Sequence, residues 1–259
     1  MRLFIIVLGI LTLAVFSCQN DQPAEDQIEP AEAIDTARQV VEQAIQRHGG
    51  ELLPAARIGF TFRGRRYEAT GVGGNYTYRR IFANESGEQI VDELTPRGLT
   101  RTIDGEAVAL TPKDSSAYAG SVNSVLYFAL LPYYLQDEAV QLTYLGLSEQ
   151  LGAPYHKVKV TFRQDGGGED FQDEYTYWIH RDSLTMDYLA YNYLTNGGGA
   201  RFRSAYHGRE VGGIRFQDYV NFKPRDERRD VWRFDSLFAA GLLDTLSLIA
   251  LEAVEVDRD

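Results

Sequence analysis

Two arginines, a histidine and an aspartate late in the chain are placed where they could bind an anion together. Arg201, Arg203 and His207 lie at odd-numbered positions of one predicted strand, and Asp218 lies on the next strand, after a glycine turn. Alternate residues of a strand share one face, so the three basic side chains are expected side by side. One interpretation is a cationic patch that binds a carboxylate or phosphate headgroup. The other is an Arg–Asp ladder between strands on a solvent-exposed face.

The four histidines do not indicate a metal site, because no two of them have ligand spacing within one element. They are His48, His156, His180 and His207. His48 ends an apolar helical stripe and is interpreted as a C-terminal histidine stabilised by the helix dipole. The acidic glycine loop at 165–170 is interpreted as a solvated hairpin loop rather than a calcium site. Nucleophile-elbow, zinc-protease, phosphate-loop and EF-hand motifs are missing from the sequence. We therefore predict no metal, no cofactor and no catalytic residue.

The lone cysteine, Cys18, lies at the end of an apolar N-terminal segment. Residues 3–16 carry no charge and follow Arg2, a pattern typical of a secretory signal peptide and short for a membrane-spanning helix. The preceding Val15-Phe16-Ser17 resembles the lipobox of bacterial lipoproteins, in which the cysteine is acylated. The sequence thus predicts a signal peptide over 1–17, lipidation of Cys18 and attachment to a membrane through that lipid.

Residues 18–33 are predicted to form a flexible tether, since after the cysteine they hold five acids, two prolines and no base. Asn20 replaces the aspartate that commonly retains such lipoproteins in the inner membrane. The lipobox resemblance therefore implies an outer-membrane lipoprotein of the cell envelope, on the periplasmic or the surface face.

Composition excludes several other classes of protein. The chain has 259 residues, of which 44% are hydrophobic and 12% aromatic, enough for a folded core. One cysteine excludes a disulfide scaffold. The 37 acids outnumber the 26 bases, which argues against binding to nucleic acid. Residues 34–259 show no second linker or repeat and are predicted to form a single β-rich domain. The sequence carries no signal of oligomeric state.

Hydrophobic periodicity predicts two helices and about ten to twelve antiparallel strands. A helical stripe runs from Ala37 to His48, with Asp35 as its N-cap and glycines after it, and a second helix covers Ser115–Leu131 before Pro132. Strands joined by short turns are expected to be antiparallel. They are predicted at 58–63, 76–82, 99–103, 107–110 (after the Asp104-Gly105 hairpin signal), 141–147, 157–162, 174–179, 186–194, 201–207, 214–222 and 246–256.

Aromatic residues occupy both faces of several predicted strands. Tyr177 alternates with Trp178, and Tyr188 faces away from Tyr191. We interpret this excess as a wide curved sheet or open half-barrel, with a core or aromatic hollow on one side and tyrosine hydroxyls in water on the other. The two helices are expected to cover its concave face. The candidate ligand-binding residues are Tyr177, His180, Tyr188, Tyr191, Arg201, Arg203, His207 and Asp218.

The order of these features is similar to that of a domain-of-unknown-function family of envelope lipoproteins. The resemblance rests on His48-Gly49-Gly50, Phe60-Thr-Phe-Arg63, Tyr177-Trp-Ile-His180, Arg201-Phe-Arg203 and Gly213-Ile-Arg-Phe-Gln-Asp-Tyr219, and covers most of residues 34–225. More distantly, the layout resembles the lipoprotein-localisation-factor superfamily. That resemblance implies an open antiparallel half-barrel closed by helices over a cavity for acyl chains.

Three functional hypotheses follow from the sequence. The first is a binding module that holds a lipid or other hydrophobic ligand in the half-barrel. The second is a structural or interaction lipoprotein with no ligand cavity, which displays an aromatic patch to a partner. The third is a hydrolase that uses His180 or His207 with a carboxylate.

Overall fold

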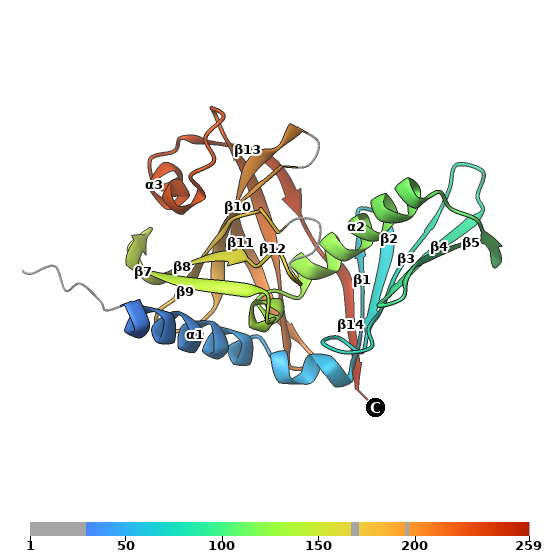
Figure 1. The fold of residues 1–259 in the computed structure, drawn as a ribbon, viewed down its shortest axis with the longest axis horizontal. Coiled ribbons are helices and arrows are strands. Elements are labelled where there is room, and N and C mark those ends of the chain that lie inside the picture. Colours follow the sequence, from blue (N-terminus) through green and yellow to red (C-terminus); the bar gives the residue numbers. More distant parts are fainter. Residues whose placement is uncertain (1–29, 167–170, 195–196, 259) are drawn as a thin grey trace, which may run out of the picture.

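The computed structural model describes residues 30–166, 171–194 and 197–258. Within these ranges the chain is mainly β, as predicted, and its strands form two antiparallel sheets of seven strands each (Figure 1). Each sheet ends in two edge strands, so neither closes into a barrel. The predicted signal peptide, Cys18 and the predicted tether up to residue 29 lie outside the described residues. No helix in the described ranges is both long and apolar enough to cross a bilayer.

The first sheet consists of consecutive hairpins, with the C-terminal strand added at one edge. Its order is β14-β1-β2-β3-β4-β5-β6. The predicted hairpin at Asp104-Gly105 is present, with positive φ at both positions, as a type I′ turn requires. The strands are β1 (Ala56–Phe62), β2 (Arg65–Thr70), β3 (Thr77–Ala83), β4 (Gln89–Thr95), β5 (Gly98–Ile103), β6 (Glu106–Val108) and β14 (Glu252–Arg258).

The second sheet is also a meander, in the order β13-β12-β11-β10-β9-β8-β7. Its central strands β9 to β12 carry the aromatic and basic residues that the sequence singles out. The strands are β7 (Val140–Gln150), β8 (Ala153–Phe162), β9 (Tyr175–His180), β10 (Met186–Tyr193), β11 (Gly199–Val211), β12 (Ile214–Pro224) and β13 (Leu243–Ile249).

Two long helices connect the sheets. Helix α1 (Pro30–Arg47) lies along β7 and β9, and leads through the 3-10 helix η1 (Gly50–Ala55) into β1 of the first sheet (Figure 1). Helix α2 (Pro112–Ala129) lies against β3, β4 and β5. Its last turn reaches the second sheet, where the ring of Phe128 lies 5.1 Å from that of Tyr191. Each predicted helix is therefore present: α1 packs on the second sheet, and α2 packs on the first sheet and reaches the second.

One apolar core joins the two sheets and the helices. It contains buried side chains from every layer, including Val41 of α1, Phe60 of β1, Leu126 of α2, Tyr177 of β9 and Phe216 of β12. The chain also changes sheets near its C-terminus, where β13 ends the second sheet and β14 begins in the first. The two sheets therefore share one core, and the chain passes from one sheet to the other.

A second, smaller core covers the outer face of the second sheet. There Trp178 and Phe202 pack against Phe234, the first residue of a short helix α3 (Phe234–Ala239). A 3-10 helix η4 (Val231–Arg233) precedes α3 and adds the buried Val231 to this core. The indole N–H of Trp178 also donates to Asp235 at 3.1 Å. Tyrosine hydroxyls of this face are predicted from the sequence to reach water. That prediction is wrong for Tyr188, which is buried in the outer core beneath α3.

The structure differs from the predicted elements in four further respects. Helix α1 begins at Pro30, with proline in the first turn, so residues 30–33 belong to it and Asp35 is not its N-cap. Strands β2 and β4 were not predicted. The predicted strand 246–256 is two strands in different sheets. The described ranges hold fourteen strands in two sheets, where the sequence predicts ten to twelve in a single curved one.

Candidate functional site

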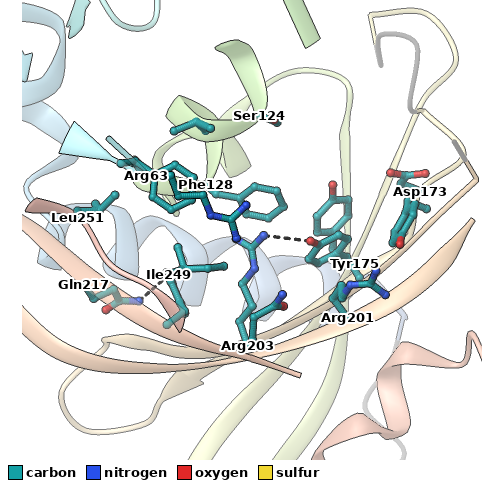
Figure 2. Close-up of a pocket in the computed structure, with 17 residues that line it drawn as sticks. Arg63, Ser124, Phe128, Asp173, Tyr175, Arg201, Arg203, Gln217, Ile249 and Leu251 are labelled. Carbon is teal, nitrogen blue, oxygen red and sulfur yellow. Dashed lines mark hydrogen bonds between the residues drawn. The ribbon is translucent and has the colours of Figure 1, made fainter. Parts of the chain in front are cut away.

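A pocket of about 450 Å³ opens between the two sheets, beneath the last turns of α2 (Figure 2). Its floor is the inner face of β9 to β12. Its walls come from α2, from the end of β1 and its turn, and from the connection between β13 and β14. The apolar and aromatic lining consists of Phe62, Val125, Phe128, Ala129, Tyr175, Tyr191, Tyr193, Tyr219, Ile249 and Leu251. The polar lining consists of Arg63, Ser124, Asp173, Arg201, Arg203, Gln217 and Asn221.

The floor of the pocket follows from strand alternation. Tyr175, Tyr191 and Arg201 stand directly opposite one another on β9, β10 and β11, so they form one row across the sheet. The rings of Tyr175 and Tyr191 stack with centroids 5.4 Å apart. Arg203 and Asn221 are paired in a neighbouring row. Phe202, which lies between Arg201 and Arg203 in the sequence, points to the other face of the sheet and into the outer core.

Arg203 is the central charged group of the pocket and is 8% exposed. Its guanidinium carbon lies 3.9 Å from the centre of the Phe128 ring, and its Nη2 donates to the hydroxyl of Tyr191 at 3.0 Å. The cation therefore packs between helix α2 and the sheet. Its Nε is buried and has no hydrogen-bond partner among the described residues.

Two more arginines and one aspartate complete the charges of the pocket. Arg63 lies in the β1–β2 turn at φ 51°, with its guanidinium 5.0 Å from the ring of Phe62. Arg201 lies over Tyr193 at 5.2 Å and donates to the carbonyl of its neighbour Ala200. The buried Asp173 stands beyond Tyr175 in Figure 2, on the side away from Arg63.

Two buried amides lie beside Arg203. Gln217 donates from Nε2 to the carbonyl of Met186 at 2.6 Å and to the hydroxyl of Tyr219 at 2.8 Å. Its Oε1, like Oδ1 of Asn221, has no hydrogen-bond partner among the described residues. Burial raises the pKa of Tyr219 to about 12, so this hydroxyl keeps its proton and remains a donor at neutral pH.

The structure places Tyr191, Arg201 and Arg203 in the pocket and the other predicted binding residues elsewhere. Tyr177 is fully buried in the main core, where burial raises its pKa well above the usual range. Tyr188 belongs to the outer core. His180 caps a turn: its Nδ1 accepts from the backbone N–H groups of Asp182 and Ser183, each at 3.2 Å.

His207 and Asp218 are in contact with each other but lie outside this pocket. Nδ1 of His207 lies 2.9 Å from Oδ2 of Asp218, and Asp218 also accepts from Arg209 and from the backbone N–H of Leu251. The strand register shifts between Tyr206 and Arg209, so His207 leaves the face that carries Arg203. Asp218 ties the bulge of β11 to the chain that enters β14.

The interpretation of His48 as a helix-dipole histidine is wrong. Burial, and to a lesser degree the charges of Arg215 and Arg47, lower the pKa of His48 to about 3. The neutral ring accepts a hydrogen bond at Nε2 from the backbone N–H of Met186, at 3.2 Å. His48 thus joins the end of α1 to the start of β10 as an uncharged acceptor.

Sequence reasoning missed the residues that reach the pocket from other elements. Phe128 and Val125 come from α2, Arg63 from a turn, and Ile249 and Leu251 from the point where the chain changes sheets. Strand alternation alone identifies Gln217, Tyr219 and Asn221, which share odd positions of β12. The described residues hold no group of three metal-ligating side chains, and residues 167–170 of the acidic glycine loop lie outside them.

A family model for proteins of unknown function, DUF6503, matches residues 75–250. The chain belongs to this family. The resemblance to a domain-of-unknown-function family is thereby confirmed. A search of curated proteins finds no match.

Solved structures with a similar arrangement share little sequence with this DUF6503 member. A LolA-superfamily protein from Nitrosomonas europaea is 10% identical, with 85% of this chain and 91% of that chain covered and a TM-score of 0.45. A DUF1329-family protein from Desulfovibrio piger is 10% identical, with 85% and 93% covered and a TM-score of 0.42. The lipoprotein LppX from Mycobacterium tuberculosis is 9% identical, with 62% and 90% covered and a TM-score of 0.27.

Proposed function

We propose that this protein is an envelope lipoprotein, acylated at Cys18 and held at the outer membrane, whose domain binds a lipid or another hydrophobic ligand. The observation that carries the proposal is the pocket between the sheets. Its volume of about 450 Å³ lies within the roughly 300–1,000 Å³ typical of small-molecule sites. Aromatic and aliphatic side chains form much of its surface, with a few polar groups among them, as in such sites.

The pocket favours a binding module over an interaction lipoprotein without a cavity. Side chains of the main core fill the space on either side, yet the inner face of β10 to β12 beneath Phe128 stays open. The hydrolase hypothesis gains less support. Asp218, the carboxylate beside His207, is already occupied by Arg209 and by a backbone N–H.

Lipid extraction from the protein purified from its native host tests the proposal. We expect mass spectrometry to detect a non-covalent hydrophobic compound in stoichiometric amount. The substitution Ser124→Trp places a large ring at the wall of the pocket and should abolish recovery of that compound. Asn123→Trp is the matched control, since Asn123 is the preceding exposed residue of α2 and does not line the pocket. Equal recovery from both variants, or no compound from the natural chain, contradicts the proposal.

The anchor needs its own experiment. Metabolic labelling with a radioactive fatty acid should label the natural chain and leave the Cys18→Ser variant unlabelled. If Cys18→Ser retains the label, or if the natural chain takes up none, the proposed lipid anchor at Cys18 is refuted. Neither result bears on the proposed pocket ligand.

A further inference from the structure

We propose that the ligand is an anionic amphiphile, whose carboxylate or phosphate headgroup binds Arg203 and whose apolar tail lies along Phe128 and the tyrosines of the floor. This inference rests on the proposed function and specifies the chemical class of the ligand.

The first argument is that Arg203 is a buried cation without a carboxylate partner among the described residues. A buried charge is costly unless an opposite charge and hydrogen bonds compensate it. Arginines in the first sheet meet this requirement: Arg80 and Arg101 both pair with Asp92. Arg203 has one hydrogen bond to Tyr191 and a ring contact with Phe128, and its buried Nε has no partner there. An oxyanion in the pocket beside this guanidinium would supply the missing counter-charge.

The second argument is the balance of charge around the pocket. Arg63 and Arg201 also line it, and neither forms an ion pair with a described residue. Three arginines therefore face a single carboxylate, Asp173, although the whole chain carries a net charge of −11. Figure 2 shows the side chain of Arg203 rising from the floor of the pocket and that of Arg63 extending toward it from a wall. Two like charges are held together more favourably when an anion lies between them.

The third argument is that the charged region adjoins an apolar one. Phe128, Val125, Ile249 and Leu251 line the same pocket as Arg203, and this surface is suited to an acyl chain. A small inorganic anion would leave it in contact with water.

Calorimetric titration tests this inference on the mature chain that the sequence predicts, residues 18–259 with Cys18→Ser, which lacks both the apolar signal segment and the acylation site. The probes are laurate, lauryl phosphate, the neutral monolauroylglycerol and inorganic phosphate. We expect the two anionic lauryl compounds to bind about tenfold or more tighter than monolauroylglycerol, as a charge-assisted hydrogen bond implies. Lauryl phosphate should likewise bind about tenfold or more tighter than inorganic phosphate.

Arginine variants test which side chain binds the anionic headgroup. Arg203→Met keeps an apolar side chain at this position and removes the charge. It should lower the affinity for the two anionic lauryl compounds about tenfold, and change the affinity for monolauroylglycerol less than about threefold. Arg63→Gln alters an exposed side chain and should weaken the same anions several-fold, so it decides the question if Arg203→Met fails to fold by circular dichroism. Arg225→Gln is the control, an exposed arginine paired with Asp244 away from the pocket.

The outcomes separate this inference from the proposed function. No binding of any lauryl compound refutes both. Equal binding of neutral and anionic lauryl compounds, unchanged in Arg203→Met or Arg63→Gln, refutes the anionic headgroup and leaves a hydrophobic-ligand module. Inorganic phosphate that binds as tightly as lauryl phosphate refutes the amphiphile, since the site then holds a free anion.

Discussion

His48 should make the stability of the protein sensitive to mild acid. The ring is 4% exposed, accepts a backbone hydrogen bond from Met186, and has its pKa lowered to about 3 by burial and by the charges of Arg215 and Arg47. In the unfolded chain the same ring has an ordinary pKa of about 6.5. Between these two values the unfolded chain binds a proton that the folded chain does not. The free energy of unfolding therefore falls as the pH falls below about 6.5, and the loss continues to about pH 3.

The size of the effect follows from the interval between the two pKa values. Each pH unit within it costs about 1.4 kcal/mol, so acidification from pH 7 to pH 5 removes about 2 kcal/mol through His48 alone. This is a large part of a typical domain stability of about 5–15 kcal/mol. Burial also lowers the pKa of the half-buried His156, which adds a loss of the same sign.

Urea unfolding at pH 7 and pH 5, followed by circular dichroism, measures this loss. The substitution His48→Gln keeps a side-chain acceptor for the Met186 N–H and removes the titrating ring. We expect the natural chain to lose about 2 kcal/mol more than His48→Gln over this interval. The contributions of the other histidines are common to both proteins and cancel. If the two proteins lose the same free energy within about 0.5 kcal/mol, the ring is not held neutral in the folded state.

Three further predictions concern the fold. Asp92→Asn should lower the free energy of unfolding by about 3–5 kcal/mol, because it leaves the buried Arg80 without its counter-charge; a urea-measured loss under about 1 kcal/mol would contradict this. Phe234→Ala should cost about 3–5 kcal/mol in the same assay, yet leave laurate binding unchanged, because the outer core lies on the opposite face from the pocket. Gly49→Ala should lower the melting temperature, since φ is 76° and the new Cβ would lie 2.3 Å from the carbonyl oxygen of Gly213. An unchanged melting temperature would show that this backbone can relax.

Strands with regular alternation could be predicted from the sequence, and those with inward-facing charges could not. In β9 the tyrosines and Trp178 alternate between two cores, so the period of two is plain. In β4 the inward positions are Ile90, Asp92 and Leu94, all buried. The central aspartate interrupts the apolar pattern, and its compensation by Arg80 and Arg101 comes from tertiary structure. No local sequence pattern predicts such a strand.

The outer core was missed for a related reason. Helix α3 has six residues, too short for a helical period to stand out, and it follows a segment rich in charges. Its position depends on Phe234 and on Asp235, which binds Lys157 and the Trp178 indole from the sheet. The change of sheets between β13 and β14 could not be predicted either. Apolar and polar residues alternate through both halves of 246–256, as they would in one continuous strand.

The candidate site was partly predicted because strand alternation is local. Arg201 and Arg203 share a face with Tyr191 across the β10–β11 pair, which their positions suffice to indicate. The same rule wrongly added His207, because it assumes an unbroken strand and the bulge after Tyr206 breaks it. The opposite wall of the pocket comes from α2, whose approach to the second sheet is set by long-range packing.

The comparison of Asp92 with Arg203 shows which feature of the sheets identifies a site. Both are charged residues at buried, inward-facing positions. Asp92 receives hydrogen bonds from two arginines and is therefore part of the architecture. Arg203 has no such partner among the described residues, and the space above it stays open instead of closing as the neighbouring core does. The abundance of tyrosine does not distinguish these cases, since stacked rings fill the core and line the pocket alike. The unpaired inward charge does, because no described carboxylate compensates its burial, whereas an anionic ligand can.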